Sequence, residues 1–188
     1  LAGRMARAQM EMGGKNPTIV LADADLDLAV TLVVKAGFGL TGQACTATSR
    51  VIVERKVVKE FNARLVAKAG ALKVGNGLAP GPEMGPAVSR QQLEANLGYV
   101  DIALKEGATL LFGGQRLGGG EYEHGHFMQP TVLGHVKPGM RIACEEVFGP
   151  VVAVLAVEDF DEALRVANGV DVGLSASIVT RDLRKAML

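Results

Sequence analysis

The sequence has no excess of charge of either sign, few cysteines and no long apolar run. Its 20 Lys and Arg residues balance 20 Asp and Glu residues, so composition gives no reason to expect binding to nucleic acid or to an anionic membrane surface. No apolar run approaches the roughly 20 residues of a membrane-spanning helix. Arg4 and Arg7 are not followed by the apolar core of a signal peptide, so secretion is not expected.

Only two cysteines occur, Cys45 and Cys144, and they lie far apart in the sequence. They could form one disulfide, but a chain of 188 residues with 48% hydrophobic residues can bury a sizeable core without it. We therefore expect free thiols, a reducing compartment and a cytoplasmic protein. Glycine is abundant, with 24 residues, which predicts many tight turns and close approaches of the backbone.

Short apolar runs alternate with amphipathic stretches along the chain. Strands are predicted at residues 18–21, 50–54, 109–112, 129–136, 151–157 and 174–179. Helices are predicted around residues 28–34, which Asp23 or Asp25 would cap, and at 57–74 (ending at the GNG of 75–77), 90–106 and 159–167. Strands that alternate with helices predict an α/β fold with three layers and a mainly parallel sheet.

Residues 42–50 (GQACTATSR) give the sharpest local signal of chemistry. The cysteine follows a glycine-containing turn between a predicted helix and a predicted strand. Such a turn can expose the thiol and direct backbone N–H groups at an atom bound to it, and Arg50 would favour the reactive thiolate. A small buried side chain is the commoner fate of a lone cysteine, so both interpretations of Cys45 stay open on these residues alone.

Two further clusters combine glycine with carboxylates. In residues 11–17 (EMGGKNP), two glycines allow the backbone to approach a ligand closely, and Glu11 could serve as a general base. In residues 145–150 (EEVFGP), adjacent carboxylates precede an aromatic residue and a Gly-Pro turn, and they could accept hydrogen bonds from sugar hydroxyls. Taken singly, the first is more often a charged loop entering a strand and the second a helix end followed by a turn.

In this order, the three motifs resemble those of the aldehyde dehydrogenase superfamily. EMGGKNP is similar to its glutamate-leucine-glycine-glycine-lysine motif, GQACTATSR to its active-site cysteine motif, and EEVFGPVV to its glutamate-glutamate-hydrophobic-phenylalanine-glycine-proline motif. FMQPTVL and GLSASIVT also resemble family segments, so the resemblance covers nearly the whole chain. It implies the fold of the family's catalytic domain. Met12 stands in place of the usual leucine, a change that conserves volume.

The resemblance implies oxidation of an aldehyde to a carboxylic acid with NAD or NADP. Cys45 would attack the aldehyde carbon to form a thiohemiacetal, and a thioester would remain on it after hydride transfer to the nicotinamide ring. Glu11 would act as the general base that activates water. The backbone N–H of Cys45 would form one half of an oxyanion hole.

The resemblance also assigns the residues that hold the coenzyme. Glu146 would bind the ribose of its nicotinamide half, and Phe148 would pack near the ring. Met12 and Gly13 would lie beside the nicotinamide, where Gly13 and Gly14 let the chain pass closely.

By the same resemblance, residues 1–188 are expected to form a single, incomplete catalytic domain, truncated at both ends. The family's coenzyme-binding domain, which precedes the first motif, and its C-terminal closing segment are absent from the sequence. We expect no useful dehydrogenase activity from this chain alone. The parent enzyme is expected to be a homo-oligomer that takes a small aldehyde, and CTATSR resembles members that act on semialdehydes.

Two other functions are considered from the residues themselves. One is a cofactor-independent thiol hydrolase or acyltransferase that uses Cys45 and Glu11, against which EEVFGPVV argues. The other is an inert folded module that packs against a partner. Residues 37–42 (GFGLTG) match G-x-G-x-x-G but follow a predicted helix, so they do not predict a dinucleotide site. His124 and His126 have no convincingly spaced third ligand, so no metal site is predicted.

Overall fold

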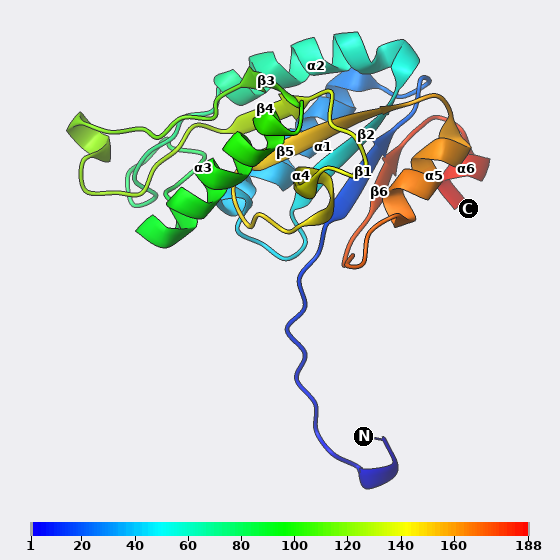
Figure 1. Cartoon of the computed structure of the whole chain (residues 1–188), viewed down its shortest axis with the longest axis horizontal. Helices are drawn as coiled ribbons and strands as arrows, with labels where there is room; N and C mark the ends of the chain where they lie inside the picture. Colours follow the sequence, from blue (N-terminus) through cyan, green and yellow to red (C-terminus); the bar gives the residue numbers. More distant parts are fainter. Residues whose placement is uncertain (1, 188) are drawn as a thin grey trace.

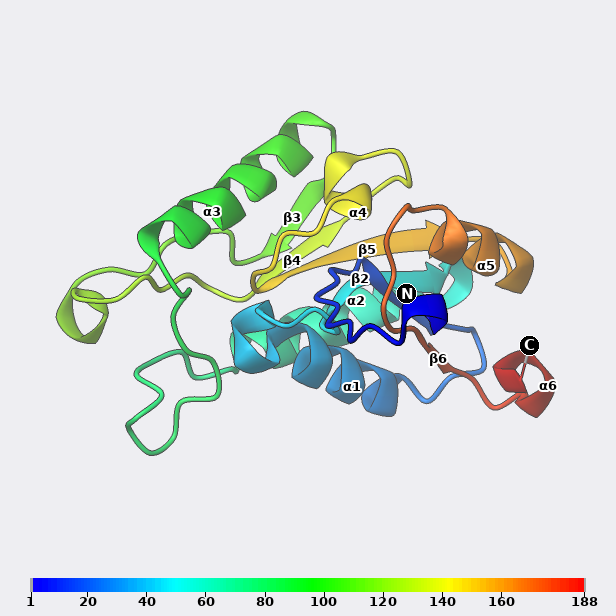
Figure 2. The ribbon, with the colours of Figure 1, turned by 90° about the horizontal axis from the view of Figure 1, so that it is seen from below.

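The structure, a computed structural model, describes residues 2–187. A six-stranded sheet lies between two layers of helices (Figures 1 and 2). The strands are β1 (Asn16–Val20), β2 (Thr48–Glu54), β3 (Thr109–Phe112), β4 (Thr131–Gly134), β5 (Val151–Val157) and β6 (Ser177–Val179). The α-helices are α1 (Leu26–Phe38), α2 (Arg55–Gly70), α3 (Arg90–Lys105), α4 (Arg141–Cys144), α5 (Phe160–Asn168) and α6 (Leu183–Met187). Three short 3-10 segments are η1 (Ala2–Arg4), η2 (Gly39–Gly42) and η3 (Gly120–Tyr122).

The sheet is mainly parallel, as the alternation of strands and helices predicted. Its order is β3-β4-β5-β2-β1-β6, and every neighbouring pair is parallel except β3 with β4. Helices α1 and α2 cover one face, whereas α3, α4 and α5 cover the other (Figure 2). The three-layer α/β prediction is therefore confirmed, with an antiparallel edge strand as an added feature.

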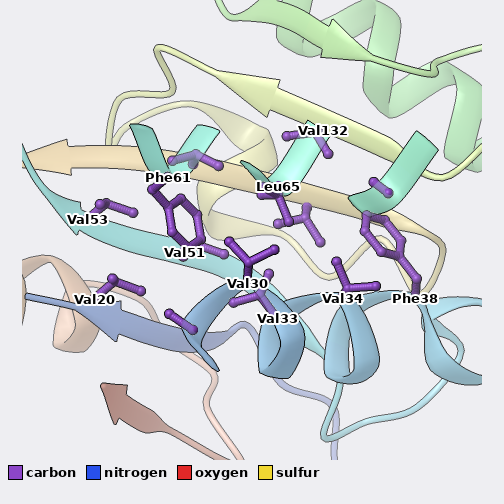
Figure 3. Packing of buried hydrophobic residues seen from close by; sticks show 14 of the residues in the cluster. Val20, Val30, Val33, Val34, Phe38, Val51, Val53, Phe61, Leu65 and Val132 are labelled. Carbon is purple, nitrogen blue, oxygen red and sulfur yellow. The ribbon is translucent and has the colours of Figure 1, made fainter. Parts of the chain in front are cut away.

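Alternating side chains of the central strands fill one core on the face covered by α1 and α2 and two on the opposite face, one under α3 and α4 and one under α5. Along β2, Val51 and Val53 point toward α1 and α2, whereas Ile52 lies between them in sequence and points toward α5. Figure 3 shows the first core, where Phe61 and Leu65 of α2 pack against the valines of α1 and the sheet. Because both faces are covered, β5 is apolar at every position, which is why its limits were predicted to the residue.

Two local predictions need correction. Helix α2 ends at Gly70, before the GNG sequence, because the chain leaves the helix to pack Leu72 and Val74 on the first core and to bridge Val74 with Met84. The strand predicted at residues 174–179 begins only at Ser177, because Leu174 and Ser175 instead bind Asn16 and Thr46.

Of the two candidate caps of α1, Asp25 is the one used: its side chain accepts hydrogen bonds from the N–H groups of Asp27 and Leu28. Asp23 instead accepts from the Thr180 hydroxyl and the Arg181 N–H. Asp23 thus ties the start of α1 to the chain after β6.

Residues 3–12 form an exposed arm that leaves the amino end of β1 and extends away from the sheet (Figure 1). Within residues 2–187, no helix has both the length and the apolar character needed to cross a membrane.

Candidate active site

The three motifs singled out in the sequence meet at one edge of the sheet. Residues 11–15 lead into β1, residues 42–47 into β2 and residues 145–150 into β5. Since β1, β2 and β5 are parallel neighbours, the segments before them emerge at the same amino-terminal edge. The sheet topology therefore gathers residues that lie more than a hundred positions apart in the chain.

Cys45 lies on an exposed turn that is preceded by strained backbone. After α1, Leu40 and Thr41 have φ values of 51° and 61°, in the left-handed region that non-glycine residues rarely adopt. The turn closes through a hydrogen bond from the Ala47 N–H to the Ala44 carbonyl (2.9 Å). The Cys45 side chain is an exposed, free thiol. Such strain persists only where surrounding contacts hold it, and it concentrates at functional sites.

Gly42 holds the cysteine turn against the EEVFGP segment. Its φ is +65°, and a Cβ at this position would overlap the carbonyl of Gly149. Gly149 in turn is enclosed by the side chain of Asn96 on α3. A side chain at either glycine would push the second and third motifs apart.

Gly13 and Gly14 hold the first motif against the third. The Gly14 N–H donates a hydrogen bond to Glu146 Oε1 (3.1 Å), and a Cβ on Gly13 would overlap Glu146 Oε2. A Cβ on Gly14 would lie 2.9 Å from the carbonyl oxygen of Cys45. Both glycines are therefore required by close approach, and they place Glu146 and the Cys45 turn on opposite sides of one backbone segment.

Asn16 is a residue of this site that the sequence analysis did not single out. Its side-chain Nδ2 donates to the carbonyl oxygens of Cys45 (2.8 Å) and Ala47 (3.0 Å). Asparagine is depleted from strands, so an asparagine at the start of the buried strand β1 was the available signal of a buried polar role.

Arg50 does not act on the Cys45 turn in the way we expected. It is 1% exposed, and its guanidinium donates to three backbone carbonyls, those of Lys15, Val166 and Ala167, each at 2.9 Å. Burial lowers the pKa of the Arg50 guanidinium from its usual value. Arg50 therefore fastens the first motif to the carboxyl end of α5.

Lys15 places a second cation beside the site. Its side chain is fully buried, and its Nζ has no hydrogen-bond partner among residues 2–187. Burial, together with the charge of Arg50, lowers the pKa of Lys15 from 10.5 to about 7, against the opposing influence of Cys144, Glu146 and Glu145. Lys15 is thus a buried group beside the site whose charge changes near neutral pH.

Glu145 faces away from the first motif and anchors the segment to α3 and α4. It accepts hydrogen bonds from Arg141 Nε (2.7 Å) and from the Tyr99 hydroxyl (2.8 Å). These bonds lower the pKa of Glu145 to about 2. The two adjacent glutamates therefore have different tasks: Glu145 holds α4 and α3 together, and Glu146 faces Gly13 and Gly14.

Phe148 is half-exposed, at 40%, and has a φ of +55°. Its ring borders an open cavity of about 600 Å³ that Gln43, Thr41 and Leu40 of the cysteine segment also line. The left-handed backbone of Phe148 turns its ring outward to the cavity instead of into the core.

The remaining predicted residues lie on the arm. Glu11 and Met12 are exposed, and the Glu11 carboxylate accepts a hydrogen bond from Gln9 Nε2 (3.5 Å). The described residues give Glu11 no hydrogen bond to the Cys45 turn. Cys144 is half-buried and donates to the Pro138 carbonyl (3.1 Å), so both cysteines are free thiols, as expected. Among residues 2–187, no three His, Cys, Asp or Glu side chains are grouped to hold a metal ion.

Comparison with solved structures gives close matches. Betaine aldehyde dehydrogenase from Staphylococcus aureus, solved in complex with NAD+, superposes with a TM-score of 0.93 at 38% identity. The match covers 99% of this chain and 37% of that protein.

Curated relatives are semialdehyde dehydrogenases. Alpha-ketoglutarate semialdehyde dehydrogenase of Haloferax volcanii is 56% identical over 180 residues, which is 96% of this chain and 37% of the relative. 2,5-Dioxopentanoate dehydrogenase of Saccharolobus solfataricus is 43% identical over 181 residues, with the same coverage of 96% and 37%. The chain thus spans a little over a third of the length of these relatives. The family model described as "Aldehyde dehydrogenase family" matches residues 1–188, and the chain therefore belongs to the aldehyde dehydrogenase family.

Proposed function

We propose that this chain carries the nucleophile of an enzyme that oxidises an aldehyde to a carboxylic acid. The observation that carries the proposal is the exposed thiol of Cys45, on a strained turn packed against Gly14 and the EEVFGP segment. A thiolate attacks a carbonyl carbon readily and also leaves readily from a thioester, so one side chain serves both halves of the reaction. Membership of the aldehyde dehydrogenase family supports the same chemistry.

Cys45 adds to the aldehyde carbon and forms a thiohemiacetal, whose oxidation leaves a thioester on the sulfur. The backbone N–H of Cys45 donates to the oxyanion at each tetrahedral stage. Water then attacks the thioester carbon, the C–S bond breaks, and the acid is released with the thiol restored.

Glu11 is the proposed base that takes a proton from this water. It lies three residues before Gly14, whose backbone contacts Glu146 and approaches the Cys45 carbonyl. Three residues of extended chain span at most about 11 Å. The arm is therefore short enough for Glu11 to act at Cys45 after a local change of direction at Met12 and Gly13.

The residues present fit the nicotinamide half of NAD or NADP. Glu146 offers a carboxylate for ribose hydroxyls, and the absence of a Cβ at Gly13 lets that carboxylate lie against the backbone of the first motif. Phe148 offers an apolar ring at the mouth of the cavity of about 600 Å³, and Met12 offers an exposed apolar side chain on the arm. When bound, NAD or NADP supplies the hydride acceptor that the oxidation requires.

We further propose that the substrate is a semialdehyde of an oxo or dicarboxylic acid, on the basis of the relatives that share 56% and 43% of their matched residues with this chain. Residues 1–188 are proposed to form the cysteine-bearing part of the catalytic domain of a cytoplasmic homo-oligomer. The adenosine contacts would come from another part of the protein.

The proposal is tested by the alkylation rate of Cys45, mapped by peptide mass spectrometry from pH 5 to 9 with Cys144 of the same chain as reference. An activated Cys45 reacts much faster than Cys144 and already does so near neutral pH. Equal rates for the two thiols would contradict the assignment. In the full-length enzyme, Cys45→Ser is expected to abolish NADH formation from a semialdehyde. Ester hydrolysis with no dependence on NAD would instead identify a thiol hydrolase.

A further inference from the structure

Asn16 is buried at 2% exposure, and its side chain uses all four of its hydrogen-bonding positions. As a donor it binds the carbonyls of Cys45 and Ala47, and as an acceptor its Oδ1 receives the N–H groups of Leu174 (3.0 Å) and Ser175 (2.8 Å). A single carboxamide therefore satisfies four backbone groups in two segments that are distant in sequence.

The carboxamide joins the cysteine turn to the residues that precede β6. A second link runs beside it, because the Ser175 hydroxyl donates to the Thr46 carbonyl (3.1 Å). The Gly14 backbone also packs against the amide, because a Cβ on Gly14 would lie 2.6 Å from Asn16 Oδ1 and 2.9 Å from the Cys45 carbonyl oxygen. The space around the amide is thus filled by backbone, and its orientation is determined.

The two donor bonds are made at the nucleophile itself and two residues after it. The Cys45 carbonyl belongs to the peptide plane that follows the nucleophile, so holding that plane restrains the Cys45 Cα, from which the side chain projects. An asparagine that merely filled space in the core would have no reason to place both donors within one turn.

We propose that Asn16 is a positioning residue that fixes the Cys45 turn in its reactive geometry and couples it to residues 174–175. The proposal rests on the proposed role of Cys45 as nucleophile. Asn16 touches no reacting atom. It acts through the carbonyls of Cys45 and Ala47, and a displacement of the sulfur by about 1 Å is enough to lower a reaction rate a hundredfold.

Two substitutions of Asn16 separate the effect of its hydrogen bonds on the Cys45 turn from the effect of a charge at the same position. Asn16→Ala removes the amide without adding charge, so the Cys45 to Cys144 alkylation ratio at pH 7 is expected to fall by about tenfold to a hundredfold. Asn16→Asp keeps the shape but turns an acceptor toward two carbonyls. Its negative charge also opposes a thiolate on the turn, so the pH profile of Cys45 alkylation is expected to move to higher pH. Asn16→Ala is expected to keep the midpoint of that profile.

A matched control removes a different buried polar group. Thr131 in β4 is fully buried, accepts from the Gly114 N–H and donates to the Gln129 carbonyl, away from the Cys45 turn. Thr131→Val is expected to lower stability and leave the alkylation ratio unchanged. Backbone hydrogen exchange gives an independent measure, because the Leu174 and Ser175 amides should lose protection in Asn16→Ala and keep it in Thr131→Val, whereas Asn16→Asp retains the acceptor oxygen.

The inference is overturned if both Asn16 variants keep the alkylation ratio and pH profile of the unaltered chain while that chain has an activated Cys45. It is also overturned if the Asn16 variants and Thr131→Val lower the ratio equally, because the effect would then be general destabilisation. An unaltered chain whose Cys45 behaves as an ordinary thiol contradicts the proposed function. In that case unchanged exchange at Leu174 and Ser175 in Asn16→Ala overturns the coupling to residues 174–175, and faster exchange in that variant supports it.

Discussion

Replacing Lys15 by methionine should stabilise the chain, and the gain should depend on pH. The Lys15 ammonium is fully buried, and its Nζ has no hydrogen-bond partner among residues 2–187. Burial and the nearby Arg50 lower its pKa from 10.5 to about 7 in the folded chain. Methionine has a similar length and no charge, so it removes the cost of burying the ammonium while filling the same space.

The direction in which the free energy of unfolding changes with pH follows from proton binding to Lys15 in the two states. Between pH 7 and about 10.4 the unfolded chain keeps the proton on Lys15 while the folded chain has lost it, so the free energy of unfolding rises with pH in this window. Below pH 7 Lys15 is protonated in both states, and the folded chain bears the full cost of burying its ammonium. Since one pKa unit corresponds to about 1.4 kcal/mol, the Lys15 contribution should rise by about 2 kcal/mol between pH 7 and pH 9.

Urea unfolding of the unaltered chain and of Lys15→Met at pH 6, 7, 8 and 9 measures this difference. The two chains share every other titrating group, so subtraction isolates Lys15. The stability advantage of Lys15→Met should be largest at pH 6 and should shrink by about 2 kcal/mol between pH 7 and pH 9. A constant difference across this range would refute the argument, because it would mean that Lys15 keeps its proton in the folded chain or is hydrated there.

Three further changes test the packing and charges of the site and core. Gly14→Ala should slow alkylation of Cys45 relative to Cys144, because the added Cβ would lie 2.6 Å from Asn16 Oδ1; an unchanged ratio would show that the segment can move aside. Arg141→Gln should raise the pKa of Glu145 from about 2 toward its ordinary value, because the guanidinium hydrogen bonds that lower this pKa are lost. NMR titration of the Glu145 carboxyl carbon measures the pKa. An unchanged value would assign the lowering to the hydrogen bond from Tyr99. Phe61→Ala should lower the free energy of unfolding by about 3–5 kcal/mol, because the ring is fully buried between α2 and the sheet. Urea unfolding with an unchanged m-value measures this loss. A loss below about 1 kcal/mol would contradict the packing of Phe61.

Patterns of apolar residues predicted much of the fold. The seven apolar residues of β5 suit a strand covered on both faces, and they were predicted to the residue. The limits of α2 were harder to predict, because the helical pattern continues to Val74 while the chain turns at Gly70 to reach Met84. That turn depends on a contact between segments, which local periodicity does not contain.

The active-site motifs were found from their sequence and family resemblance, but the atoms that join them were not. Gly42 contacts Gly149, and the Gly14 N–H binds Glu146 across 132 positions of sequence. In the sequence, Asn16 is a polar residue before a proline, and nothing there indicates which four backbone groups it binds. The roles of Glu11 and Glu146 in catalysis and coenzyme binding stay predictions.

The location of the site explains why buried donors matter in it. Ligands of open parallel α/β sheets usually bind at the carboxyl ends of the strands, whereas Cys45 lies before β2, at the amino edge. The helices run back against the strands, so their carboxyl ends, with unpaired carbonyls and partial negative charge, reach this edge. Arg50 donates to two such carbonyls at the end of α5, and its positive charge is favoured there. Asn16 likewise donates to two backbone carbonyls, those of Cys45 and Ala47, but its side chain is neutral. An amide can hold the turn in place without the desolvation cost that a third buried cation would carry, and this is why a neutral donor suits that position.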